Sequence, residues 1–152
     1  MMWFSLLFCL AVIAAAVVVD VANIALVLSN GFYFLDAQSL IIVLPVAILF
    51  GISATSWRTY GRCWTYPLGS AKFVSISEAN SVARCLKVMG DVALTMGFIG
   101  TFIGSVFIFQ NLTPASNFGQ GLAVASLTLA YGVVFKLVSY VAEQRVRNIY
   151  LN

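Results

Sequence analysis

Four apolar runs of about 20 residues each constrain the fold of this chain more than any motif does. They cover about 3–28, 38–57, 88–110 and 119–142 of the 152 residues. Only 9% of the residues are charged and the mean hydropathy is +1.01, whereas a soluble domain of this size needs far more charge to cover its surface. We therefore expect an all-α integral membrane protein, with four transmembrane helices in a single domain over 1–152.

The basic residues predict the orientation of these helices. The loops near 29–37 and 111–118 contain no Lys or Arg, whereas the connection 58–87 contains five basic residues: Arg58, Arg62, Lys72, Arg84 and Lys87. Arg145 and Arg147 follow the fourth span. By the positive-inside rule the connection and the C-terminus are cytoplasmic, and an even number of spans places the N-terminus there too. Because the charges follow topology and form no patch, we expect contact with the lipid bilayer and not with nucleic acid.

A long helix is predicted to begin at Ile76, because Ser75 and Glu78 have the spacing of a capping box. Neither Gly nor Pro interrupts the chain from there to Met89. If the helix continues to Gln110, it is about 52 Å long, which exceeds the hydrocarbon core of about 30 Å. The third span would then extend into the cytoplasm, with the fourth span packed beside the extension.

Glycines and hydroxyls are concentrated inside the last two spans. The glycines, which permit close helix packing, are Gly97, Gly100, Gly104, Gly121 and Gly132. The hydroxyl residues are Thr101, Ser105, Ser126 and Thr128. A hydroxyl in a membrane helix commonly bonds the carbonyl oxygen one turn back and has no further role. Gly97, Thr101 and Ser105, however, recur every four residues and mark one helical face, which favours an ion pathway along that face.

Three charged residues are placed in the spans by this reading: Asp20 in the outer part of the first, Asp91 near the inner end of the third, and Lys136 about two turns before the end of the fourth. A charge at the bilayer centre costs about 3 kcal/mol, so Lys136 is expected either to extend to the headgroups or to pair with Asp91. Neither of the last two spans has a carboxylate near its middle. Proton conduction needs a titratable group, so its acid would be Asp20 or would come from another chain.

Three segments of the chain match the motifs of a known family. They are Gly100, Thr101 and Gly104 for its Gly-Thr-x-x-Gly; Asn111, Leu112 and Pro114 for its Asn-Leu-x-x-Pro; and 119–132 for its Gly-Pro-x-x-Ala-Val-Ala-Leu-Leu-Thr-Thr-Leu-Tyr-Gly. Residues 38–54 are more loosely similar to its second span. The chain thus resembles the MotA/TolQ/ExbB proton channel family, and most closely the flagellar stator A subunits within it.

The resemblance implies a homopentamer around two copies of a single-span partner like MotB, TolR or ExbD, in the bacterial inner membrane. The partner would bring an aspartate, and flow of H+ or Na+ would turn the ring about it without a cofactor. The last two spans would line the pore, with Thr101 and Thr128 facing the ion path.

Three positions depart from the family pattern. Leu129 stands where the family has its second threonine, Gln120 replaces a proline, and the connection 58–87 is far shorter than the rotor-contacting insertion of stator subunits.

Two other functions fit the sequence: a small four-span proton-coupled transporter that uses Asp20, and a non-conducting scaffold that pentamerises through its glycines. A cleaved signal peptide over 1–19 is disfavoured because no basic residues precede the apolar run. The chain has no His and no phosphate-binding loop, and its cysteines Cys9, Cys63 and Cys85 are widely spaced. We therefore expect neither an enzyme nor a metal site nor a disulfide framework.

Overall fold

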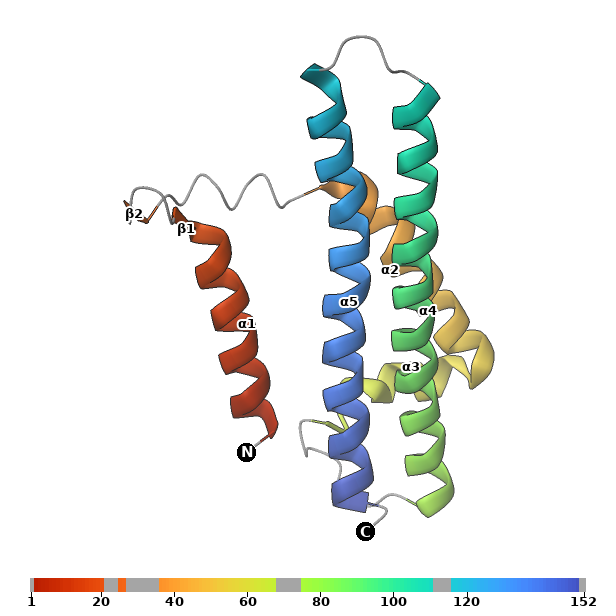
Figure 1. Ribbon diagram of the computed structural model, residues 1–152. Helices are drawn as coiled ribbons and strands as arrows, with labels where there is room; N and C mark the ends of the chain where they lie inside the picture. Colours follow the sequence, from red (N-terminus) through yellow and green to blue (C-terminus); the bar gives the residue numbers. More distant parts are fainter. Residues whose placement is uncertain (1, 21–24, 27–35, 68–74, 111–115, 151–152) are drawn as a thin grey trace. The chain divides into compact units, whose positions relative to one another are not determined.

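The computed structural model describes residues 2–20, 25–26, 36–67, 75–110 and 116–150, in two compact units, Met1–Ala37 and Gln38–Asn152. The elements along the chain are α1 (Met2–Val18), β1 (Val19–Asp20), β2 (Ala25–Leu26), α2 (Ala37–Ala54), α3 (Trp57–Cys63), α4 (Ile76–Gln110) and α5 (Ser116–Tyr150) (Figure 1). Apart from one pair of two-residue strands, every regular element among the described residues is therefore a helix. With that exception the expected helical class is confirmed.

The first unit corrects the prediction of one continuous helix over 3–28. α1 ends at Val18 after 17 residues, and the two strands that follow pair in antiparallel register. The partners are Val19 with Leu26 and Asp20 with Ala25. The physical reason is local, because the run 17–19 consists of β-branched valines, which fit a strand better than a helix. The turn predicted near 29–31 lies outside the described residues.

In the second unit, α2 confirms the predicted second span but ends at Ala54. The chain then enters α3, where the Ser56 hydroxyl accepts a hydrogen bond from the Thr59 amide at 3.3 Å and so caps the helix. The predicted cytoplasmic connection 58–87 is thus not an extended loop. Among its described residues it contains most of α3 and the first turns of α4.

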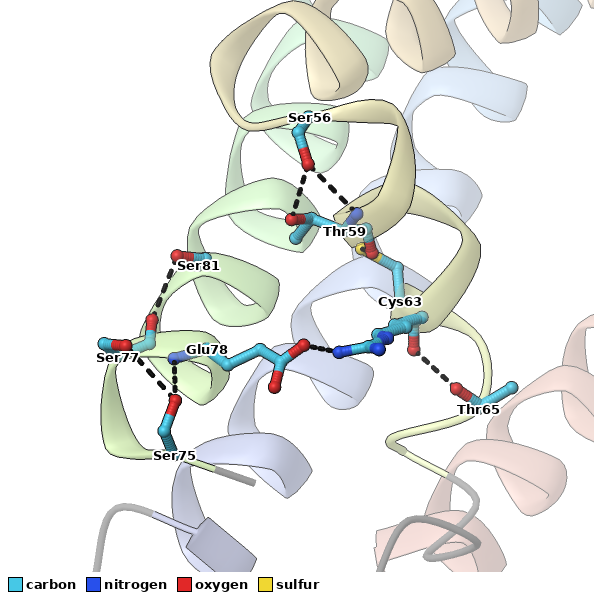
Figure 2. A network of polar contacts seen from close by, with 9 residues as sticks. Ser56, Thr59, Cys63, Thr65, Ser75, Ser77, Glu78 and Ser81 are labelled. Atoms are coloured by element: carbon cyan, nitrogen blue, oxygen red, sulfur yellow. Dashed lines mark hydrogen bonds and ion pairs between the residues drawn. The ribbon is translucent and has the colours of Figure 1, made fainter. Parts of the chain in front are cut away.

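Polar contacts join α3 to the start of α4 (Figure 2). The Arg62 guanidinium forms an ion pair with the Glu78 carboxylate. The Ser75 hydroxyl accepts a hydrogen bond from the Glu78 amide at 3.3 Å, which is the cap that the sequence predicted. The Glu78 side chain therefore links the two helices, while its backbone amide is satisfied by the cap.

α4 and α5 lie side by side along their length (Figure 1). α4 confirms the long helix predicted from Ile76 to Gln110, and both helices have 35 residues. Each is about 52 Å long, so both are longer than the hydrocarbon core of about 30 Å. The side of the membrane on which the extra length lies is still a prediction from the basic residues.

Three helices of the described part of the chain are long and apolar enough to cross a membrane: α2, α4 and the segment Gly121–Tyr150 of α5. The largest buried cluster lies where α3, α4 and the end of α5 meet. Its bulkier members are Cys63, Tyr66, Val82, Leu86, Met89 and Val146. The Tyr66 ring also meets the Tyr150 ring edge to face, with centroids 5.6 Å apart. This cluster fixes the N-terminal part of α4 and the C-terminal part of α5 against each other.

Candidate functional site

Glycines bring the backbones of α4 and α5 into direct contact. A Cβ atom at Gly132 would lie 2.7 Å from the carbonyl oxygen of Ala93 and 3.1 Å from the Cα of Gly97. Toward the other end of the pair, a Cβ at Gly104 would lie 2.9 Å from the Ala125 Cβ. Gly121 faces Ile108 in the same way, at 2.8 Å. The predicted packing glycines thus all lie where the two helices touch: Gly97 and Gly132 meet backbone, whereas Gly100, Gly104 and Gly121 meet side chains.

Thr101 spans the contact between the helices. Its hydroxyl lies 2.9 Å from the Gly97 carbonyl oxygen on its own helix and 2.9 Å from the Ala125 carbonyl oxygen on α5. A hydroxyl has one proton to donate, so the two carbonyl oxygens share it or alternate. Neither contact donates a hydrogen bond to the lone pairs of the Thr101 hydroxyl oxygen. Thr101 therefore presents an acceptor oxygen at a half-buried position between α4 and α5.

Thr128 lies on the other side of this contact, against α2. Its hydroxyl is 2.8 Å from that of Ser39, and the two residues are 4% and 2% exposed. The Thr128 methyl group fills the space at Gly100, where a Cβ would lie 2.5 Å from it. Sequence reasoning missed Ser39, although a hydroxyl in an otherwise apolar span was the available signal. The ion-path role of Thr128 stays a prediction, and its hydroxyl is held at a junction of three helices.

The other two hydroxyls of the expected set bond within their own helices. The Ser105 hydroxyl donates to the Thr101 carbonyl at 2.8 Å, and the Ser126 hydroxyl donates to the Leu122 carbonyl at 2.8 Å. Ser126 is exposed, on the face of α5 that turns away from α4. The structure therefore separates the four predicted hydroxyls: Thr101 and Thr128 connect helices, whereas Ser105 and Ser126 do not.

Asp91 and Lys136 form an ion pair that joins α4 to α5. The sequence left pairing and extension to the headgroups open for Lys136, and the structure has the pair. The Asp91 side chain is 52% exposed and that of Lys136 is 29% exposed. Asp20, the third charged residue expected in the membrane, belongs to the strand β1, and its side chain lies outside the described part.

Cys63 and Cys85 belong to the buried cluster where α3, α4 and the end of α5 meet. The hydrogen bond that the Cys63 thiol donates to the Cys85 sulfur, followed by burial, raises the pKa of the Cys63 thiol, so this cysteine stays protonated. Within the described residues, no group of three His, Cys, Asp or Glu side chains is placed to hold a metal ion. The buried thiols are part of the packing and not of the hydroxyl site.

Comparison with known proteins identifies the part of the chain that contains α4 and α5. The model of the MotA/TolQ/ExbB proton channel family matches residues 74–151. The chemotaxis protein PomA of Vibrio alginolyticus is 42% identical over 48 residues, which are 32% of this chain and 19% of PomA. The match thus spans about a fifth of that relative's length. No solved structure matches the chain significantly.

The family match covers more than half of the chain and includes the whole of α4 and α5, with the glycine contact, Thr101 and Thr128. On this ground the chain belongs to the MotA/TolQ/ExbB proton channel family.

Proposed function

We propose that this protein is an ion-conducting ring subunit that couples the flow of H+ or Na+ to mechanical work. The observation that carries the proposal is the packed pair of α4 and α5 within a family of proton channels. Backbone contact at Gly97 and Gly132 packs the two helices closely together. The Thr101 hydroxyl supplies an oxygen between them.

A partner subunit supplies the acid in this proposal. The described membrane part of α4 and α5 has no carboxylate level with Thr101, and proton transfer needs a titratable group. A single-span protein that carries an intramembrane aspartate meets this need. The proposed assembly is therefore five copies of this chain around two copies of that partner, in the bacterial inner membrane.

The assembly is tested by native mass spectrometry of the chain expressed together with the single-span protein of an adjacent reading frame. The expected species contains five copies of this chain and two of the partner. A stable monomer or dimer that ignores the partner would contradict the proposal. Transport by the chain alone that is lost in Asp20→Asn would instead support the small transporter.

Conduction is tested in liposomes that contain the complex, with an imposed H+ or Na+ gradient. Thr101→Ala removes the oxygen between α4 and α5, and we expect flux to fall about tenfold, which corresponds to about 1.4 kcal/mol in the barrier. The matched control is Thr55→Ala, because the Thr55 hydroxyl lies outside α4 and α5 and donates to the Gly51 carbonyl on α2, at 3.0 Å. Flux through the wild-type complex no higher than that of empty liposomes, with the ring intact, would indicate a non-conducting scaffold.

A further inference from the structure

The ion pair of Asp91 and Lys136 lies close to the inner boundary of the membrane. Asp91 is about 28 Å from the outer end of α4 at Gln110, and Lys136 is about 30 Å from the start of α5 at Ser116. These lengths match the hydrocarbon core of about 30 Å. Along α4, Asp91 is the first charged side chain that a cation entering from the outer end would meet.

Gly90 lets α5 pack closely against α4 beside the pair. A Cβ there would lie 3.0 Å from the Lys136 Cδ and 3.0 Å from the Ser139 Cβ, so these two side chains fill the space at the glycine. Ser139 is only 1% exposed, and its hydroxyl has no hydrogen-bond partner in the described part of the chain. A buried hydroxyl normally has a partner. Ser139 therefore brings an uncommitted hydroxyl to the level of Gly90, the residue before Asp91.

The pair also indicates which edge of the two helices faces the pore. Ionisable side chains within membrane spans face a bundle interior or a water-filled cavity, and both of these side chains are partly exposed. On α5, Leu129 precedes Lys136 by two turns, and the two side chains point in directions about 20° apart around the helix axis. On α4, the side chains of Ser105 and Asp91 point in directions about 40° apart. The same edge thus runs from the level of the hydroxyls to the inner boundary.

Building on the proposed function, we propose that Asp91 is the cation-release site at the inner end of the ion path, with Lys136 as its resident counter-ion. An arriving cation replaces the Lys136 ammonium at the Asp91 carboxylate. If the cation is a proton, it forms an O–H bond on the carboxylate, and Lys136 keeps all its protons and extends along its flexible stem toward the headgroups. The O–H bond then breaks, the proton enters cytoplasmic water, and the ion pair forms again. A sodium ion binds and leaves without any bond to hydrogen.

The charged and titratable neighbours of the pair favour release over retention. Lys87 lies one turn nearer the inner end on α4, and Tyr140 lies one turn beyond Lys136 on α5; both are exposed. α2 carries no ionisable side chain. Lys136 pairs with Asp91, and Lys87 adds a second positive charge one turn away on α4. An arriving cation must therefore compete with these charges for the carboxylate. The site therefore binds a cation weakly, as a release site must.

The test is flux through the reconstituted complex as a function of cation concentration and pH. Asp91→Asn removes the site, and we expect maximal flux to fall by about tenfold or more. Lys136→Gln removes the competing ammonium, and we expect the half-saturating cation concentration to fall about threefold to tenfold. The matched control is Glu78→Gln, which breaks the ion pair between α3 and α4 and should leave flux unchanged.

The alternative is a purely structural ion pair. It predicts equal losses in the two single variants and recovery in the double variant Asp91→Asn with Lys136→Gln, where two amides hydrogen-bond. That result, or wild-type flux in Asp91→Asn, would overturn the release site while leaving the proposed function intact. Native mass spectrometry shows whether each variant assembles. If the wild-type complex itself conducts no more than empty liposomes, the proposed function fails, and the release site fails with it.

Discussion

At the scale of single residues, the hydroxyl pair of Ser39 and Thr128 explains how α2 is held against α5. Both side chains are almost fully buried and their oxygens are 2.8 Å apart. Inside a membrane such a bond is worth about 0.6 kcal/mol on average and at most about 1.7 kcal/mol. The bond is useful mainly because it is specific, since apolar contacts alone do not fix the register of two helices in lipid.

This pair makes a prediction about stability. Ser39→Ala and Thr128→Val should each lower the free energy of unfolding in mixed micelles by about 1 kcal/mol. The double variant should lose little more than the larger single loss, because both changes remove the same bond. Ser126→Ala is the control, since that exposed hydroxyl bonds only its own helix. Fully additive losses at the two buried positions would show that the hydroxyls act independently.

At the scale of helices, the contact between α4 and α5 depends on the absence of side chains at the glycines. A Cβ at Gly132 would lie 2.7 Å from a backbone carbonyl oxygen, and backbone cannot move aside as the end of a flexible side chain can. By contrast, Gly61 in α3 has nothing within 4 Å of its added Cβ. Substitutions at Gly132 and Gly61 therefore distinguish the effect of helix packing on stability from the effect of intrinsic helix propensity.

The same substitution should have opposite effects at these two glycines. Gly132→Ala should destabilise the protein by about 1–3 kcal/mol, because the two helices must move apart. Gly61→Ala should be neutral or stabilise it by up to about 1 kcal/mol, because alanine is the better helix former. Unfolding in mixed micelles, monitored by circular dichroism, measures both. A stable Gly132→Ala variant would mean that the helix contact tolerates a wider spacing.

Local signals explain which helices the sequence predicts well. The start of α4 follows from Ser75, whose hydroxyl caps the first turn by accepting from the Glu78 amide. Its length follows from a run without proline that becomes a membrane span. Apolarity alone, however, does not distinguish helix from strand in a run of valines, so the prediction for α1 continued past Val18. The Ser56 cap of α3 was likewise a local signal in the sequence. Gly61 and the short length of the helix, seven residues, hid α3 from the sequence-based prediction.

Contacts between distant residues are the part of the candidate site that the sequence does not reveal. Ser39 and Thr128 are 89 residues apart, and no spacing rule connects them. Helical periodicity does show that Thr128 and Leu129 point about 100° apart, but only the structure shows that Thr128 faces α2. The ion pair of Asp91 and Lys136 was reachable from the sequence because charges in a membrane need partners.

At the scale of the whole molecule, one face of α5 is uncovered by the described residues of its own unit, Gln38–Asn152. Ala123, Ser126 and Ala130 are exposed, and they lie on the side of α5 opposite to Ala125 and Gly132, which contact α4. Small side chains in a membrane helix let another helix approach closely, and dispersion contacts then stabilise the association. In the proposed ring this face meets a second helix, either from a neighbouring copy or from the partner.

A large side chain on this face should therefore prevent assembly of the ring without destabilising the single chain. Ala130→Trp places a large ring where close approach is needed, so native mass spectrometry should show loss of the ring, while unfolding of the single chain is unchanged because Ala130 is exposed. The matched control is Ile41→Trp on α2, at a position that is 68% exposed and surrounded by other apolar side chains. Lipid accommodates a tryptophan there, so the ring should persist. If Ala130→Trp also assembles, the small-residue face of α5 is not the surface through which the ring closes.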